Sequence, residues 1–360
     1  MSEINDNKIY YWLSLAGVGA RKLTVALSVF SPEKIYFEIG RDKALGEFFG
    51  KYTEVLVKSK SPDFLDEKLG ELYKYDIKLL TLASEKYPHR LKEAEVCPPV
   101  VLYYRGDLPC LDKPCVAVVG TRAVSSYGKD AAKKFAFDFA ASGVTVVSGL
   151  ATGADSYAHE AAAEIGTTAA VLGGGHKFIP AYSQNLAEKL LEKGGIIISE
   201  YPPDFCPTKY TFPERNRIVS GLSMAVVVIE AGEKSGALIT AGYALEQGRE
   251  VYAVPGGIFS VKSVGSNRLL RSGQAGVALS AADIMSDLRI NIGLKGQKNT
   301  AISLDFSEQN IYSLLVSGET GFDDLVLQSG FPPAELNGLL FSLELKGVVR
   351  RLPNNRYRLE

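Results

Sequence analysis

The sequence has few of the residues that hold metal ions or build disulfide frameworks. It contains four cysteines and three histidines in 360 residues. Cys97, Cys110, Cys115 and Cys206 show neither the CxxC spacing nor the neighbouring histidine that is typical of zinc sites. A chain of this length also buries enough apolar surface to fold without disulfides. We therefore expect reduced, structural thiols and no metal site.

Long hydrophobic runs and an excess of charge of one sign are also lacking. Apolar runs such as residues 224–229 are far shorter than the roughly 20 residues that cross a bilayer. The N-terminal segment is acidic and lacks the basic-then-apolar pattern of a signal peptide, so we expect a cytoplasmic protein without membrane contact. With 40 basic and 41 acidic residues, the chain has no overall basic coat. A local cationic pocket would not show in this sum.

The motifs of nucleotide-dependent and hydrolytic enzymes are missing. No GxGxxG follows the first strand expected in the central region, and the nearest match to GxxxxGK[ST], at residues 128–130, lacks the upstream glycine. Ser148 is not part of a GxSxG nucleophile elbow. Asp155 and Glu230 could act as general acid or base, but no nucleophile–base pair or metal cluster accompanies them, and His159 is expected to be structural. We expect no catalytic residue, no cofactor and no enzymatic activity.

Hydrophobic periodicity divides the chain into three predicted domains. Residues 1–78 have apolar residues at helical spacing, and their GVG turn fits either a plain turn or a helix-hairpin-helix contact to phosphate. From 79 to 290, short β-branched runs alternate with helical segments, which predicts βαβ units in a Rossmann-like, mostly parallel α/β sheet. Residues 291–302 predict a linker. Residues 303–360 predict helices followed by a hairpin, as in a winged helix.

Five expected strands of the central domain run into segments rich in glycine and serine. Six strands are expected, at 116–119, 144–147, 168–172, 196–199, 224–229 and 250–254, and all but the one at 196–199 run into such a segment. Helices are expected at 128–141, 155–165, 183–193 and 237–247. Carboxyl ends of parallel strands share one edge of a sheet, where the helix N-termini that follow carry unpaired N–H groups. Converging loops of this kind predict a site for phosphate groups.

A basic and aromatic segment, PTKYTFPERNR, occupies residues 207–217. It places three cations around Tyr210 and Phe212. The cations are Lys209, Arg215 and Arg217. Cations neutralise phosphates and aromatic faces stack on bases of any identity, so this composition favours binding of a single strand.

Several segments of the central domain resemble the DNA-processing protein A (DprA, Smf) family, in that family's order. They are AVVGTRAVSSYG, SGLATGADSYAHEAA, PERNRIVSGLS, VIEAGEKSGALITAGYALEQGREVYAVPG and GSNRLLRSG. The resemblance implies a SAM-like helical domain, a Rossmann-like domain and a winged helix. It also implies a homodimer that binds and protects single-stranded DNA and loads RecA recombinase on it in natural transformation.

The resemblance also implies roles for particular residues. Arg122 and Lys209 would meet phosphates, Phe212 would meet a base, and the loops 148–153 and 235–236 would donate N–H groups. The chain departs from the family at Thr152, where the family often has a cation, and this difference would weaken one phosphate contact. The candidate DNA-binding residues are Arg122, Ser148, Gly149, Gly153, Lys209, Phe212, Arg215, Asn216, Arg217, Ser235 and Gly236.

Two alternatives stay open. Phe212 could pack in the core while the arginines form ion pairs, one of them holding the loop through Glu214 or Glu230; Asn216 fits either interpretation. The glycine-rich crevice would also suit a nucleotide-processing hydrolase or a nucleotide sensor. Related hydrolases carry PGGxGT, whereas PGG at residues 255–257 is followed here by Ile-Phe.

The C-terminal domain and one apolar segment point to protein contacts. The expected recognition helix, residues 333–347, carries Glu335 and Glu344 and no basic residue before Lys346. DNA-reading helices are usually basic, so we expect mainly a protein-contact or regulatory module. The basic wing, Arg350 to Arg358, would be at most a secondary DNA contact. An apolar stretch at 258–270 is the candidate dimer surface.

Overall fold

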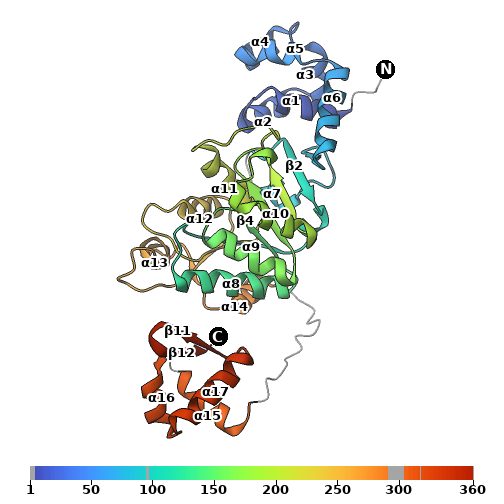
Figure 1. The fold of residues 1–360 in the computed structure, drawn as a ribbon. Coiled ribbons are helices and arrows are strands. Elements are labelled where there is room, and N and C mark those ends of the chain that lie inside the picture. The colour runs from blue at the N-terminus through green and yellow to red at the C-terminus, as the bar shows by residue number, and fades with distance from the viewer. Residues whose placement is uncertain (1–4, 95–96, 291–303, 317, 360) are drawn as a thin grey trace. The chain divides into compact units, whose positions relative to one another are not determined.

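The structure, a computed structural model, describes residues 5–94, 97–290, 304–316 and 318–359 (Figure 1). Contacts group the chain into two compact units, Met1–Ile292 and Gly293–Glu360, and each is described by itself. The predicted linker at 291–302 lies outside the described residues. The boundaries of the predicted domains stay predictions.

The first unit is built on a nine-stranded sheet with the order β1-β2-β6-β5-β4-β3-β7-β8-β9. Strand β2 pairs antiparallel with β1 and β6, and every other neighbouring pair in this sheet is parallel. The mostly parallel α/β fold is therefore confirmed. The strands are β1 (Lys78–Thr81), β2 (Val101–Gly106), β3 (Cys115–Val119), β4 (Thr145–Ser148), β5 (Thr168–Leu172), β6 (Ile196–Ser199), β7 (Ala225–Val228), β8 (Glu250–Ala253) and β9 (Gly276–Val277).

Helices cover both faces of this sheet because the strands are apolar on both sides. Val116 and Val118 pack with one set of helices, while Ala117 and Val119 pack with the other. The first set is α8 (Ser126–Ala141), α9 (Ala154–Ile165), α10 (Ala181–Glu192) and α14 (Ala281–Asp287), and the second is α7 (His89–Ala94), α11 (Thr211–Gly221), α12 (Gly236–Glu246) and α13 (Val264–Arg271). Near-continuous apolar strands of this kind are expected in a parallel sheet with both faces covered.

The strand order reverses at β3. After β3 the chain adds β4, β5 and β6 on one side, and it then returns to place β7 on the other side of β3. Helices leave such a reversal on opposite faces, which opens a crevice at the carboxyl ends of the strands. The candidate site lies here.

The N-terminal helices share a core with the edge of the sheet. Trp12 and Leu65 pack in one buried cluster with Val101 and Tyr103 of β2, and Figure 1 shows these helices beside β2. The glycine-rich turn between α1 and α2 uses Gly17 at φ +69°, where glycine is favoured. The helices are α1 (Asp6–Leu15), α2 (Ala20–Val29), α3 (Pro32–Glu38), α4 (Lys43–Phe49), α5 (Thr53–Lys58) and α6 (Pro62–Lys74).

The second unit is a winged helix with its own core, as the sequence predicts. Its helices pack around Ile311, Leu340 and Tyr357. A three-stranded sheet has the order β10-β12-β11, and Asn354 and Asn355 turn the wing with φ of 62° and 57°. The elements are α15 (Phe306–Leu315), β10 (Thr320–Gly321), α16 (Phe322–Ser329), α17 (Pro333–Leu345), β11 (Val349–Leu352) and β12 (Arg356–Leu359).

Candidate nucleic-acid interface

A cavity of about 670 Å³ opens at the carboxyl ends of β3 and β4, between the first turns of α11 and α12. Most of the candidate residues line it, although they come from four separate loops and helices. They are Arg122, Gly149, Lys209, Phe212, Arg215, Asn216, Ser235 and Gly236. Ser148, Gly153 and Arg217 do not line it. The fold thus brings together the strand-end loops and the basic–aromatic segment.

Arg122 and Phe212 lie together at the mouth of this cavity. The Arg122 guanidinium is 5.7 Å from the centre of the Phe212 ring, and the Arg122 side chain is exposed. The ring is half-buried and rests on Gly173: a Cβ there would approach Phe212 Cδ1 to 2.6 Å. The glycine-rich loop after β5 therefore seats an aromatic ring beside an exposed cation.

Lys209 and the N-terminus of α12 supply further polar groups. The exposed Lys209 ammonium lies 5.0 Å from the ring of Tyr210, whose side chain is 67% exposed. Ser235 caps α12 by accepting from the Ala237 N–H, and Gly236 is exposed. The cavity therefore offers two exposed cations, Arg122 and Lys209, and one exposed helix N-terminus, where anions are favoured.

Arg215 corrects one expectation. Its side chain is buried, and its guanidinium donates to the carbonyl oxygens of Gly149, at 2.7 Å, and Val171. A Cβ at Gly149 would collide with this guanidinium, so a glycine is required there. Burial lowers the pKa of Arg215 and raises that of Asp155, and each group's charge opposes the other's shift. Arg215 forms the floor of the cavity rather than an exposed phosphate contact.

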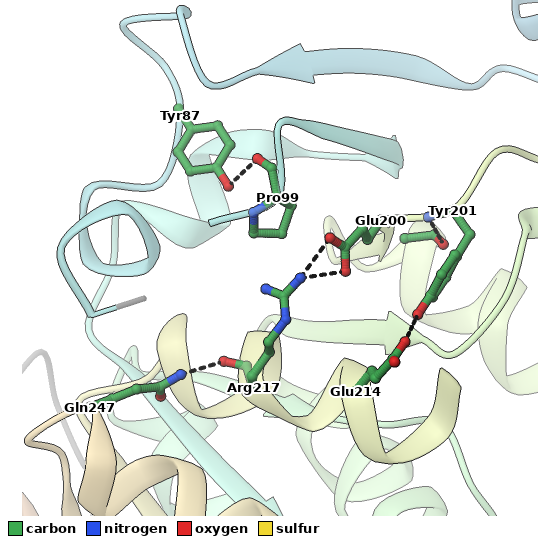
Figure 2. Close-up of polar contacts among 8 residues, drawn as sticks. Tyr87, Pro99, Glu200, Tyr201, Glu214, Arg217 and Gln247 are labelled. Atoms are coloured by element: carbon green, nitrogen blue, oxygen red, sulfur yellow. Dashed lines mark hydrogen bonds and ion pairs between the residues drawn. The ribbon is translucent and has the colours of Figure 1, made fainter. Parts of the chain in front are cut away.

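Arg217 is a second correction. It lies on another face of α11, and its Nη2 donates to both carboxylate oxygens of Glu200, at 2.6 and 2.7 Å (Figure 2). Its side chain is only 13% exposed. The ion pair foreseen as the alternative does form, but the partner is Glu200, while Glu214 accepts from the Tyr201 hydroxyl. Arg217 ties α11 to the end of β6.

The loop after β4 is folded inward, which corrects the expectation for Ser148, Gly149 and Gly153. The Ser148 hydroxyl is buried and donates to the Val118 carbonyl at 2.7 Å. The Gly149 N–H donates to the Asp155 carboxylate at 3.1 Å, so an internal anion already uses it. Gly153, at φ +88°, packs its Cα against the carbonyl groups of the loop after β3. Ser148 and Gly153 are thus buried, and the Gly149 N–H has a partner within the protein.

Groups in two further loops of this edge also have partners within the protein. Glu230 is buried and accepts from both the N–H and the hydroxyl of Ser125, at 2.8 and 2.6 Å, where α8 begins. Gly256 exchanges two hydrogen bonds with the Asn267 side chain. Among the glycines that line the cavity, the exposed one is Gly236 at the N-terminus of α12. Asp155 and Glu230 are the two residues considered as a general acid or base. In the structure, Asp155 accepts from Gly149 in the loop after β4, and Glu230 accepts from Ser125 in the loop after β3, so both carboxylates hold loops in place.

His159 is structural, as expected. It is fully buried, and burial lowers its pKa to about 3. The Thr168 hydroxyl donates to the Val146 carbonyl, so Nδ1 of His159 is the donor in its 2.7 Å hydrogen bond to Thr168. Within the described part of the chain, no group of histidines, cysteines and carboxylates is arranged to hold a metal ion. Nor does any helix there have the length and hydropathy needed to cross a bilayer.

The sequence analysis did not predict three residues that line the cavity, one isoleucine and two threonines. Ile239, which is 42% exposed, and Thr240 line the cavity from the first turns of α12, and Thr208 lines it from the loop before α11. The signal available was spacing: Ile239 and Thr240 follow the Ser235 cap by about one helical turn. An exposed isoleucine in such a cavity provides an apolar contact surface.

Comparison with known proteins agrees with this architecture. A family model described as DNA recombination-mediator protein A matches residues 78–289, and one described as DprA winged helix domain matches residues 296–355. Protein Smf of Escherichia coli strain K12 is 38% identical over 292 residues, which cover 78% of this chain and 77% of that protein. Protein Smf of a Synechocystis strain is 30% identical, over 98% of this chain and 99% of its own length.

Two solved structures are similar in fold. The crystal structure of DNA processing protein A from Streptococcus pneumoniae matches with a TM-score of 0.67 and 30% identity, over 79% of this chain and 98% of that one. DNA processing protein A from Helicobacter pylori, described for its single-stranded DNA binding mode, matches with a TM-score of 0.53 and 30% identity, over 59% of this chain and 96% of that one. With both family models in chain order and these relatives, the chain belongs to the DprA family of DNA recombination-mediator proteins.

Proposed function

We propose that this protein binds single-stranded DNA through the cavity between α11 and α12 and protects it. In this proposal the protein is a cytoplasmic homodimer that loads RecA recombinase on the strand during natural transformation, and it is not an enzyme. The related protein from Helicobacter pylori is described as binding single-stranded DNA, which supports the first step. Family membership as a recombination mediator supports the second.

One observation carries the binding proposal: the contact between Arg122 and Phe212, with Lys209 lining the same cavity. A base stacked on an aromatic face adds about 1–3 kcal/mol with little dependence on its identity. Cations beside the ring meet the phosphates that flank such a base. A duplex keeps its bases stacked inside, so this arrangement favours a single strand. Gly236 and Asn216 would complete the path of the backbone.

The proposed homodimer has a candidate surface in the loop after β8. Ile258, Phe259 and Val261 are 82%, 94% and 77% exposed. Contiguous exposed apolar side chains of this kind mark protein contacts. The proposed surface is therefore limited to residues 258–261 of the stretch 258–270, because Leu269 is buried in the core of the first unit.

The test is a salt titration of binding to labelled single-stranded and double-stranded oligonucleotides. Single strands should bind more tightly. Lys209→Ala should reduce the slope of log affinity against log salt by about 0.7, the value for one single-strand phosphate contact. Phe212→Ala should weaken binding at every salt concentration and leave the slope unchanged. Lys193→Ala and Tyr182→Ala, at exposed positions outside the cavity, are the matched controls.

The nucleotide-processing alternative predicts a different result. A mononucleotide site would bind a single nucleoside phosphate as tightly as an oligonucleotide and would show a salt slope of about one contact. Equal affinity for duplex and single strand, or no dependence on oligonucleotide length, would contradict the proposed function. The positioning roles of Asp155 and Glu230 give the hydrolase no general acid or base among the residues considered for it.

A further inference from the structure

The outward face of α17 carries an apolar stripe. Leu336, Leu340 and Leu343 of this helix are buried in the core of the second unit. With about 100° between successive residues of a helix, a second set of side chains falls on the opposite side. That set is Ala334, Gly338, Phe341 and Leu345, all exposed, with Phe341 at 62% and Leu345 at 74%. In a DNA-reading winged helix the outward face of this helix would carry the contacts to the groove.

Gly338 has no explanation within its own unit. Glycine in a helix interior is destabilising relative to alanine. The φ of Gly338 is not in the left-handed region, and a Cβ built there would meet nothing within 4 Å. The side chain is therefore not excluded by anything in the second unit. A glycine on an exposed helix face does allow another backbone or a large side chain to approach closely.

We propose that α17 pairs antiparallel with α17 of a second copy of the chain, about a two-fold axis between Gly338 and Phe341. The stripe has a small half, Ala334 and Gly338, and a large half, Phe341 and Leu345. Antiparallel pairing sets the small half of each copy against the large half of the other. A surface that is complementary to itself in this way suits a two-fold, isologous contact.

The charged residues that flank the stripe fit the same arrangement. Glu335 and Lys346 lie on one flank, and antiparallel pairing brings Glu335 of each copy beside Lys346 of the other. Lys346 is held in place by Glu308, at 2.5 Å, and its side chain is still 36% exposed. Glu344 lies on the other flank, beside Asn337 of the second copy. No like charges are placed opposite one another.

A nucleic acid fits this face less well than a second copy does. The helix carries two carboxylates and no cation before Lys346, so it offers phosphates no partner along its length. One helix pair buries less than the roughly 1,200 Å² of a standard stable interface. The contact is therefore weak and is best detected by a covalent trap in the full chain.

Disulfide trapping tests the register directly. The full chain carries Cys206→Ser, which removes the exposed native thiol, together with Ala334→Cys and Leu345→Cys. The two new thiols are about 16 Å apart along one helix, so they cannot pair within a chain. On mild oxidation they should form a covalent dimer. The matched control pair is Glu335→Cys with Glu344→Cys, whose thiols lie on opposite flanks and should not meet.

A further variant tests the role of the glycine. Gly338→Leu in the trapping background fills the small half of the stripe, while the space around its own Cβ is open, so the unit should keep its circular dichroism spectrum. The covalent dimer should be lost. Gln328→Leu, on the exposed surface of α16, should leave it unchanged. Dimerisation through the loop at Phe259 alone would give the same yield of covalent dimer with both cysteine pairs, so equal yields would overturn the proposal. A covalent dimer that still forms in the Gly338→Leu variant would overturn it as well.

Discussion

Arg217 and Lys209 are both cations of the segment 207–217, yet their side chains have different surroundings in the structure. The Arg217 side chain, 13% exposed, is paired with Glu200, whereas Lys209 is exposed in the cavity. Breaking a largely buried ion pair leaves an uncompensated charge. Arg217→Ala should therefore lower the free energy of unfolding by about 3 kcal/mol.

The same variant should leave the salt slope of single-strand binding unchanged, whereas Lys209→Ala should reduce it. Denaturant unfolding and the salt titration, run on both variants, separate the two effects. A slope that falls in Arg217→Ala, with unfolding unaffected, would place this residue on the DNA after all.

The variant Gly173→Ala tests the orientation of the Phe212 ring without removing the ring itself. A Cβ at this position would approach Phe212 Cδ1 to 2.6 Å, so Gly173→Ala should push the ring off its seat. If Phe212 stacks on a base, affinity for single strands should drop by an amount comparable to Phe212→Ala, about 1–3 kcal/mol, at constant salt slope.

A double-mutant cycle provides the check on Gly173. Once Phe212→Ala is present, Gly173→Ala should cost nothing more, because the group it displaces is gone. Additive losses in the two variants would mean that the glycine acts on binding by another route.

At the scale of elements, a buried carboxylate of α15 links this helix to α17 and its C-terminal end in the second unit. Glu308 is buried and accepts from Lys346 and Ser342, and these hydrogen bonds lower its pKa to about 2. Its usual pKa is about 4.3. A carboxyl whose pKa is lower in the folded state stabilises that state fully above the usual pKa. The stabilisation is lost as the pH falls through the folded value.

The winged helix should therefore lose stability between about pH 4.3 and pH 2. Amide hydrogen exchange of α15 and α17 measures this in the full chain, where the single tryptophan reports only on the first unit. Glu308→Gln should lower protection at neutral pH and flatten its acid dependence. Unchanged acid dependence in that variant would show that another group is responsible.

Much of the fold follows from the sequence at this scale, and α11 is the instructive exception. The strand at 168–172 and the helix at 155–165 are confirmed with bounds that differ by at most one residue. Each of these segments has a regular pattern of apolar residues, and that pattern alone is enough to predict the element. The helix over 211–221 is not predicted, because it contains Pro213 and begins in a polar segment. A proline in the first turn breaks no helical hydrogen bond, so it is tolerated there.

The missed helix explains the misplaced site residues. Taken as an extended loop, the segment 207–217 presents all its cations to one ligand. Wound as α11, it turns Phe212 and Asn216 to the cavity, buries Arg215 beneath it and directs Arg217 to Glu200. Which residue lines the cavity and which contacts the rest of the protein is set by the phase of the helix, and composition does not contain that phase.

At the scale of the whole molecule, the two units should divide the work. The cavity lies entirely within the first unit, and α17 carries no cation before Lys346. Deletion of residues 300–360 should change single-strand affinity by less than a factor of about three, whereas Arg122→Ala removes a cation from the cavity and should cost more. Fluorescence anisotropy at one salt concentration compares the two. Equal losses would mean that the winged helix is a main DNA contact.

Glu230 follows β7 and accepts hydrogen bonds from Ser125 at the start of α8, which bears on the anions that the protein would select. A helix end next to the first strand of a Rossmann-like sheet is where a dinucleotide is ordinarily held, and here the protein's own carboxylate occupies it. Free nucleotides and inorganic phosphate, abundant in a growing cell, lose their strongest point of attachment. What is left is the set of separate polar groups that line the cavity, which a polymer with several phosphates would use together. The same carboxylate that fixes a loop would thus keep the cavity free for the proposed DNA strand.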